Sequence, residues 1–288
     1  MQTFATFDAA RALFENKFYS RSYEVKAPHW QGVDVSRKPD MAMRELFAES
    51  FQVPLRGIED LEHWKADIKP NLPFADVTFA ERIGGEPLNP GESWKVWPWG
   101  HSADKFRNAN GQFDHTYQER FWPKFAGVHY SPEGRTALTD RNDPNTGIRF
   151  EYGDLDNLID HLLKDPLSRQ AYLPIWFPED LHPEAKRKPC TLGYHFLMRH
   201  GYLHLTYHIR SCDFVRHWAD DCYLAVRLLL HVLDELRGRD KYGDWRPVKP
   251  GMYVMHIASF HMFVNDWIAL KVKHDHKVKR LQASTQQS

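Results

Sequence analysis

Three segments of the chain carry side chains that could do chemistry together. They are Lys188-Pro189-Cys190-Thr191, His208-Ile209-Arg210-Ser211-Cys212-Asp213 and Ser259-Phe260-His261-Met262-Phe263-Val264-Asn265. Cys190 could act as a nucleophile, because the nearby Arg210 would lower the pKa of the thiol and raise the thiolate fraction at neutral pH. The alternative is a small buried side chain of the core, which is the commoner role of a free cysteine.

Arg210 and Ser211 close a predicted strand on its polar face and could form an anion site. A bidentate guanidinium together with a hydroxyl group suits a phosphate. Arg169, in Ser168-Arg169-Gln170, could add to this site. The simpler alternative is an ion pair at a sheet edge and a serine in a turn.

Two aspartates and three histidines have simple structural explanations. Asp220 and Asp221 precede an apolar helix, where carboxylates cap the helix and complement its dipole. His200, His204 and His208 recur at every fourth residue, which suggests a metal site. On a strand, however, His204 and His208 would lie about 13 Å apart at roughly 3.3 Å per residue, too far for one ion. We therefore expect these histidines to line a polar sheet face, and we predict no metal.

The C-terminal half predicts the elements that would position these residues. A hairpin is predicted over residues 194–199 and 202–210, joined by His200-Gly201, because its second strand alternates apolar and polar side chains. A strongly apolar helix follows, from Asp220 or Asp221 to about Arg237, with Gly238 as its C-terminal stop. Residues 250–263 predict a further strand.

The N-terminal half is less regular. Helices are predicted over residues 8–18, with Asp8 as N-cap, over residues 39–52 and over residues 155–163. Residues 53–150 are rich in Pro, Gly and Asn and predict an irregular region that could carry binding groups. The polar chain after Lys279 is expected to fray. Because strands and helices are interspersed, we expect an α/β or α+β fold in one domain.

Composition excludes several classes of protein. Lys+Arg and Asp+Glu are both 38, so the chain lacks the basic excess of a nucleic-acid or acidic-membrane binder. Hydrophobic residues make up 42%, enough for a sizeable core. Three cysteines without a CxxC pair argue against a disulfide scaffold or a cysteine zinc site, and for a reducing, cytoplasmic setting. No stretch predicts a secretory signal or a membrane span.

Taken in order, these segments resemble the thymidylate synthase family, and especially its pyrimidine hydroxymethylase branch. That family has Pro-Cys at the head of a strand, then Arg-Ser-x-Asp at the spacing seen here, then a His-x-Tyr strand similar to His261-Met262-Phe263. Met43-Arg44-Glu45-Leu46 resembles the helix that bears the family's catalytic glutamate. Residues 111–117 with Trp122 resemble its Gly…Tyr…Trp segment, and Pro166-Leu167-Ser168-Arg169 its Pro-Asp-Ser-Arg segment.

The resemblance implies a thymidylate synthase-like domain over residues 1–288, with a large mixed sheet flanked by helices and a homodimer formed through the sheet. It implies that Cys190 adds to C6 of a pyrimidine nucleoside monophosphate, and that 5,10-methylenetetrahydrofolate donates a one-carbon unit to C5. Glu45 and Tyr117 would handle protons, while Asp213 and Trp97 would contact the folate. The residues implied to bind the phosphate and sugar are Arg169, from the partner subunit, Arg210, Ser211, His261 and Phe263.

Departures from the family pattern bear on the substrate. Asp221 stands where thymidylate synthases have an asparagine that recognises uracil, and a carboxylate accepts a hydrogen bond from the N4 amino group of cytosine. We therefore predict dCMP or CMP as substrate, although a protonated Asp221 could instead donate to N3 or O4. Phe263 replaces a tyrosine that contacts the sugar, which leaves ribose and deoxyribose open. Water would give a hydroxymethyl product, and hydride a methyl product.

Three alternatives stay open. One is methylation of dCMP, or of dUMP as in thymidylate synthases. Another is a non-catalytic homologue that binds a nucleotide, which is motivated by Gln170 in place of the family's second arginine, by Phe263 and by the lack of the family's C-terminal tail. The third is a metal protein based on the histidines.

Overall fold

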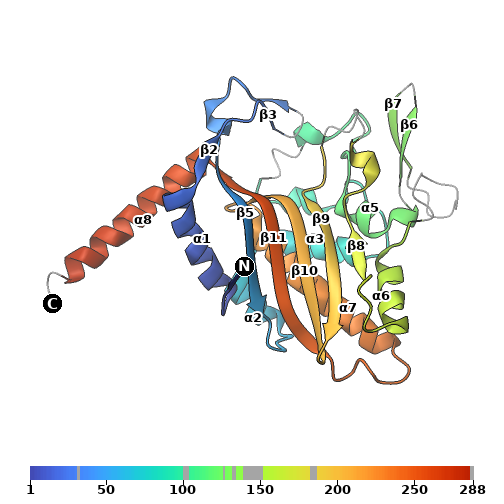
Figure 1. Ribbon diagram of the computed structural model, residues 1–288. Coiled ribbons are helices and arrows are strands. Elements are labelled where there is room, and N and C mark those ends of the chain that lie inside the picture. The colour runs from blue at the N-terminus through green and yellow to red at the C-terminus, as the bar shows by residue number, and fades with distance from the viewer. Residues whose placement is uncertain are drawn as a thin grey trace.

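The computed structural model describes residues 1–30, 33–99, 104–125, 127–131, 134–138, 152–181 and 187–285. A mixed sheet lies at its centre, with the strand order β1-β5-β11-β10-β9-β8 and with β2 paired to β5 (Figure 1). Its strands are β1 (Gln2–Thr3), β2 (Tyr23–Val25), β5 (Met43–Pro54), β8 (Tyr172–Pro174), β9 (Thr191–Arg199), β10 (Tyr202–Asp213) and β11 (Lys249–Phe263). Two short hairpins are formed by β3 (His29–Trp30) with β4 (Val33–Asp34), and by β6 (Gly127–Ser131) with β7 (Gly134–Leu138).

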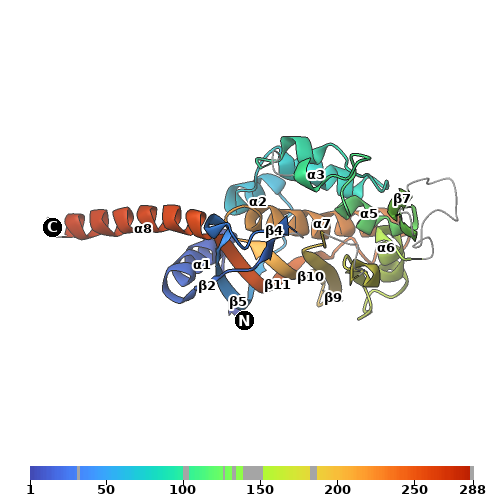
Figure 2. The ribbon, with the colours of Figure 1, turned by 90° about the horizontal axis from the view of Figure 1, so that it is seen from above.

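Helices cover one face of this sheet. The long helix α7 lies against β10 and β11 and also contacts α2, α3 and α6, while α1 packs on β5 (Figures 1 and 2). Helix α8 continues from β11 and projects away from the sheet (Figure 2). The helices are α1 (Phe7–Arg21), α2 (Leu61–Ile68), α3 (Phe74–Ile83), α5 (Tyr117–Phe121), α6 (Leu155–Lys164), α7 (Trp218–Arg239) and α8 (Val264–Thr285). None of the helices described combines the length and apolar character needed to cross a membrane.

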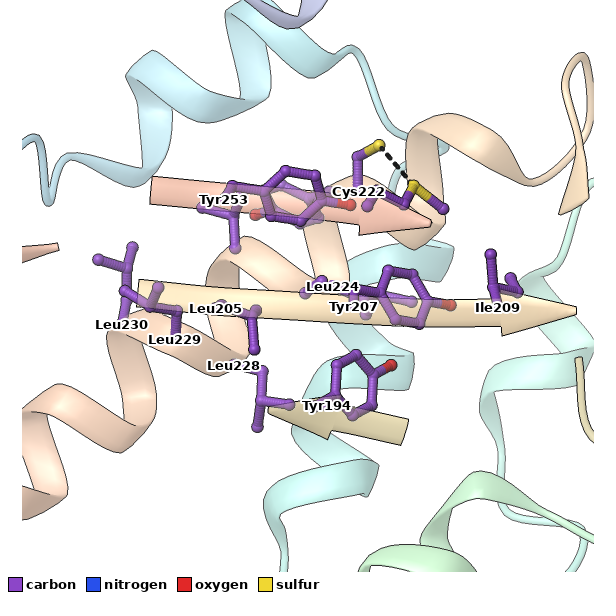
Figure 3. Close-up of a cluster of buried hydrophobic side chains, with 14 of the residues drawn as sticks. Tyr194, Leu205, Tyr207, Ile209, Cys222, Leu224, Leu228, Leu229, Leu230 and Tyr253 are labelled. Atoms are coloured by element: carbon purple, nitrogen blue, oxygen red, sulfur yellow. Dashed lines mark hydrogen bonds between the residues drawn. The ribbon is translucent and has the colours of Figure 1, made fainter. Parts of the chain in front are cut away.

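The predicted hairpin is confirmed as β9 and β10. Its turn residues His200 and Gly201 both have positive φ, which matches the right-handed twist of the strands that they join. Alternate residues of β10, including Leu205 and Tyr207, are buried against α7, and Figure 3 shows them facing its leucines. His204 and His208 lie on the opposite face, and no described group of three His, Cys, Asp or Glu could hold a metal ion.

The predicted strand over residues 250–263 is confirmed as β11, which lies parallel to β10. Parallel neighbours need a crossover, and α7 provides it. The register places Ser211 opposite Ser259 and Asp213 opposite His261. The C-terminal ends of the two strands, which carry the candidate site residues, therefore lie side by side at one end of the sheet.

The helix predicted over residues 39–52 is wrong. A short 3-10 turn, η1 (Pro39–Met41), is followed by strand β5. Ala48 has a φ of 54° and interrupts the pairing with β11, while the register is the same on both sides of it. Across this point the buried positions change from even to odd numbers, from Leu46 to Phe51, and this change makes the apolar spacing look helical. Hydrogen bonding to β11 on one side and to β1 and β2 on the other outweighs local propensity.

Several element boundaries also differ from the prediction. Helix α1 has Thr6 as its N-cap in place of Asp8. In α7, neither predicted aspartate is the cap: both lie in the first turn, and the helix passes through Gly238 before it ends. The helix predicted over residues 155–163 is confirmed as α6. The region 53–150, expected to be irregular, contains α2 and α3, and the chain after Lys279 continues α8 to Thr285.

Two glycines provide a matched test of this packing. In β9, an added Cβ at Gly193 would lie 2.7 Å from the Leu173 carbonyl oxygen and would also collide with the Tyr172 hydroxyl. Gly193→Ala should therefore lower the free energy of unfolding by about 1–3 kcal/mol. Gly238 in α7 has nothing within 4 Å, so Gly238→Ala should raise it by about 0.5–1 kcal/mol. Urea denaturation checks both values, and equal effects of the two substitutions would contradict this packing.

Candidate active site

A cavity of about 810 Å³ opens where β10 and β11 end and β9 begins. Its size suits a small-molecule ligand. Most of the candidate residues line it, namely Trp97, Tyr117, Cys190, Arg210, Ser211, Asp213, Asp221, His261 and Phe263. Residues 187–190 before β9, the first turn of α7, and α3 and α5 close the cavity around the strand ends.

Cys190 immediately precedes β9, at the head of a strand as predicted. Its carbonyl oxygen accepts a hydrogen bond of 2.9 Å from the Arg210 backbone N–H, which ties the thiol to the end of β10. Enclosure in the cavity raises the pKa of the thiol, and the positive charges of Arg210 and Arg187 only partly oppose this effect. Arg210 does lower the pKa of the thiol, as expected, but desolvation raises it by more. The expectation of a lowered thiol pKa was therefore wrong.

Arg210 is held by the backbone of the segment that precedes Cys190. Its Nε donates to the Pro189 carbonyl oxygen at 2.8 Å, and its Nη2 donates to the Lys188 carbonyl oxygen at 2.9 Å. The guanidinium also lies 5.6 Å from the ring centroid of Trp176. These contacts fix its plane and direct it into the cavity beside Ser211, which is suitable for an anion.

Asp220 and Asp221 both line the cavity from the first turn of α7, but their environments differ. Asp220 accepts hydrogen bonds from the backbone and side-chain amides of Asn71, at 2.7 and 2.9 Å, while its pKa is raised by burial to about 6. Asp221 lies 3.4 Å from the Cys212 thiol, and its pKa is raised by desolvation to about 7 although Arg82 lowers it. Burial thus brings the pKa of Asp221 close to neutral pH.

Tyr117 begins α5 and links two walls of the cavity. Thr116 caps this helix in a capping box with Glu119, which fixes where the tyrosine ring emerges. The Tyr117 hydroxyl accepts a hydrogen bond of 3.3 Å from Thr191 Oγ1, next to the nucleophile candidate. Burial raises the pKa of Tyr117 to about 12, so the hydroxyl stays protonated at neutral pH.

Asp213 and His261 face each other across the β10–β11 register. Asp213 accepts hydrogen bonds from the backbone N–H groups of Val215 and Arg216, at 2.9 and 3.0 Å, so one of its oxygens holds its own loop. Burial lowers the pKa of His261 although Asp213 opposes this, and its Nδ1 has no hydrogen-bond partner among the described residues. His261 is therefore a neutral group that can still bind a ligand.

Aromatic side chains form one wall of the cavity. Trp97 stacks on His217, with ring centroids 5.3 Å apart and planes within 20°. Trp99 lies edge-on to Trp97, and Arg216 lies 4.4 Å from the ring centroid of Phe263. Flat apolar surfaces of this kind can receive a planar heterocycle.

The sequence model of the thymidylate synthase family matches residues 88–282, which include Cys190 and both strands of the site. This chain belongs to the thymidylate synthase family. The deoxyuridylate hydroxymethyltransferase of Bacillus phage SP01 is 28% identical over 149 residues, 49% of this chain and 36% of that protein. A Methanosarcina barkeri protein with the provisional name thymidylate synthase is 29% identical over 113 residues, 39% of this chain and 47% of that protein. The chain therefore spans less than half the length of either relative.

The fold agrees with this membership. Thermostable thymidylate synthase A from Bacillus subtilis has a TM-score of 0.61 to this chain at 14% identity, covering 96% of this chain and 84% of that one. The predicted thymidylate synthase fold, with its large mixed sheet and flanking helices, is confirmed. Members of the family use methylenetetrahydrofolate as the one-carbon donor.

Two candidate residues of this family member do not line the cavity. Glu45 lies on β5, with His261 as its β11 partner, because the predicted helix is a strand. Its carboxylate accepts hydrogen bonds from the Tyr23 hydroxyl at 2.7 Å and from the hydroxyl of Ser259, which does line the cavity. Arg169 is exposed beyond the other edge of the sheet, where its carbonyl oxygen lies 3.0 Å from His195 Nε2.

Other cavity residues were missed from the sequence. Thr78 and Arg82 come from α3, and His217 and Lys188 lie beside residues that were chosen. Lys188 stands within the first motif segment and His217 lies four residues after the second, so both were within reach of the sequence pattern. Thr78 and Arg82 carried no such signal, because α3 lies within the region taken as irregular and before the segment that matches the family.

The raised pKa of Asp221 predicts a pH dependence of stability. Between the usual value of 3.8 and about 7, the folded chain holds a proton that the unfolded chain has lost. The free energy of unfolding should therefore fall as pH rises from about 4 to 7 and level off above. In Asp221→Asn this contribution is absent. As pH rises from about 4 to 7, the free energy of unfolding of the variant should therefore increase relative to that of wild type, by up to about 1.4 kcal/mol per pH unit.

Urea denaturation at half-unit steps from pH 4.5 to 8 measures this difference. Asp244→Asn, at an exposed position, is the control, and its difference in stability from wild type should not change with pH. Parallel pH profiles for wild type and Asp221→Asn would contradict the placement of Asp221 in a desolvated site.

Proposed function

We propose that this chain transfers a hydroxymethyl group to C5 of a cytidine nucleotide, dCMP or CMP, with methylenetetrahydrofolate as donor. The observation that supports this is the convergence of Cys190, Arg210 and Asp221 from three elements on one cavity. Each suits a different part of a nucleoside monophosphate, namely C6 of the base, the phosphate and the exocyclic group at C4.

The phosphate would be bound at the end of β10. Arg210 offers a guanidinium whose orientation is set by the Pro189 and Lys188 carbonyls, and Ser211 adds a hydroxyl in the same cavity. We propose that Arg169 completes this site from a second copy of the chain, in a homodimer formed through the sheet. Its exposure, away from the cavity of its own chain, supports that role.

The chemistry would begin at Cys190. Its thiolate adds to C6, so an S–C6 bond forms and the electron pair of the C5–C6 double bond makes C5 nucleophilic. Tyr117 would stay protonated beside Thr191 and could donate a hydrogen bond within this network. Glu45 would act on the site through Ser259, as a positioning residue.

The cavity also fits a folate. Its aromatic wall offers the Trp97–His217 stack to a pterin ring, and the Trp97 indole N–H is buried without a hydrogen-bond partner among the described residues. Asp213 would hold the polar edge of the pterin. When bound, methylenetetrahydrofolate supplies a one-carbon unit at the oxidation level of formaldehyde.

Asp221 is the residue that we propose recognises the base. As a carboxylate it accepts a hydrogen bond from the N4 amino group of cytosine. With uracil, the carboxylate would face O4, and because both groups are acceptors no hydrogen bond could form. A second candidate substrate is a uridine nucleotide, because the pKa of Asp221 is raised to about 7 and a protonated carboxyl can donate to O4. The name of the phage SP01 relative also specifies deoxyuridylate.

Product analysis tests the reaction. When wild type is assayed in parallel with methylenetetrahydrofolate and dCMP, CMP or dUMP, a cytidine nucleotide should be hydroxymethylated with release of tetrahydrofolate, and dUMP should not, as detected by mass spectrometry. Cys190→Ala should lower the rate by about a thousandfold or more, because the covalent route is lost. Cys222→Ala, in the core, is the control and should stay active.

The outcomes separate the alternatives. A methyl product with dihydrofolate would move the chain to the methylating branch. Nucleotide binding without exchange of the C5 hydrogen would indicate a non-catalytic homologue, and full activity of Cys190→Ala would refute the mechanism.

Asp221→Asn tests base recognition separately. An amide can donate to O4 and accept from N3–H, so the variant should shift the ratio of kcat/KM for dCMP over dUMP toward dUMP by about 10- to 100-fold. Steady-state kinetics with both nucleotides measures the ratio. An unchanged ratio would mean that Asp221 does not contact the base.

A further inference from the structure

One face of α3 lines the cavity and carries two polar side chains. Phe74, Thr78 and Arg82 follow at four-residue intervals and all line it. Thr78 and Arg82 are only 5% and 7% exposed, and neither Thr78 Oγ1 nor Arg82 Nε has a hydrogen-bond partner among the described residues. Because buried donors without partners are costly, these two groups indicate a ligand acceptor at this wall.

The position of Arg82 in the cavity is defined by its neighbours. Its guanidinium lies 4.2 Å from the ring centroid of Tyr117, and its backbone carbonyl accepts a hydrogen bond of 2.8 Å from the Trp122 indole. Its charge opposes the burial that raises the pKa values of Asp220 and Asp221. Arg82 therefore lies on Tyr117 and acts electrostatically on both aspartates of the first turn of α7.

Two other arginines act on the nucleophile. The positive charges that oppose the desolvation of the Cys190 thiol are those of Arg210 and Arg187. Arg210 and Arg187 thus act on the thiol and the phosphate site, whereas Arg82 acts on the proposed base-recognition residue, Asp221. An arginine offers only hydrogen-bond donors, so the ligand atom that it meets must be an acceptor.

We propose that Arg82 is a specificity-determining residue that donates a hydrogen bond to N3 of cytosine, next to the N4 amino group held by Asp221. This inference rests on the proposed function for the identity of the base. The Asp221 carboxylate alone recognises the N4 donor of cytosine but not the N3 acceptor beside it. Asp221 and Arg82 together recognise both the donor and the acceptor.

The same contact would assist the addition step. When the thiolate bonds to C6, the electron pair of the C5–C6 double bond moves into C4–C5, and the C4–N3 pair moves onto N3. Negative charge therefore accumulates on the atom that Arg82 faces. A fixed cation at that point stabilises the transition state more than the ground state.

A binding cycle tests this inference without turnover. The probes are dCMP and 3-deaza-dCMP, in which a C–H group replaces N3, and the measurement is Kd by calorimetry. Wild type should bind the analogue roughly 10- to 100-fold more weakly than dCMP. Arg82→Met, which keeps an apolar stem on the Tyr117 ring, should bind both ligands with similar affinity.

Two further variants serve as controls. Arg227→Met removes another arginine that lies on an aromatic ring of α3, 4.1 Å from the Phe79 centroid, but it does not line the cavity and should keep the wild-type discrimination. If Arg82→Met fails to fold in a thermal melt, Arg82→Lys keeps the charge and loses the planar fork, and it should reduce the discrimination.

The outcomes distinguish this inference from the proposed reaction. Wild-type discrimination in both Arg82 variants, or equal weakening of both ligands, would overturn the N3 contact even if dCMP is hydroxymethylated. Arg82-dependent discrimination without any C5 product would support the contact and refute the reaction. Binding of dUMP but not of dCMP would overturn both the cytidine assignment and the N3 contact.

Discussion

Strands β10 and β11 lie parallel, and this pairing requires α7 to carry the chain from the end of one strand to the start of the other. The register that results sets Asp213 against His261. Antiparallel pairing of β9 with β10 then brings Cys190 to the Arg210 backbone. A slip of one residue would turn every side chain of a strand to the other face, so the buried face of the hairpin also protects the site.

Helix α7 therefore has two tasks that conflict. Its body must be apolar, because its leucines pack on the sheet (Figure 3) and it also contacts α2, α3 and α6. Its first turn carries Asp220 and Asp221 into a poorly hydrated cavity. A helix N-terminus favours carboxylates, but desolvation is the stronger effect here and raises both pKa values. Asn71 offsets part of that cost for Asp220, which leaves Asp221 as the carboxyl available to a ligand.

The parts of the site that could be predicted are those defined by local pattern. The alternation of residues 203–210 and the segments around Cys190 and His261 place their residues correctly, because strand period and turn chemistry are local. Glu45 could not be placed, since the interruption at Ala48 hides the strand pattern of β5 and its partners are distant in sequence. Arg82 was missed because the cavity face of α3 is partly polar, so the helix lacks the continuous apolar stripe expected of a buried helix.

The charges of the cavity link recognition of the base to activation of the nucleophile. Desolvation keeps the Cys190 thiol protonated, and the negative charge of Asp221 raises the thiol pKa further, against Arg210 and Arg187. A ligand that donates a hydrogen bond to Asp221 spreads that negative charge and reduces its effect on the thiol. Under the proposed function, a base that donates to Asp221 would thus favour the thiolate that adds to it. A base that leaves the carboxylate uncompensated would keep the thiol protonated, so Asp221 would contribute to both selectivity and rate.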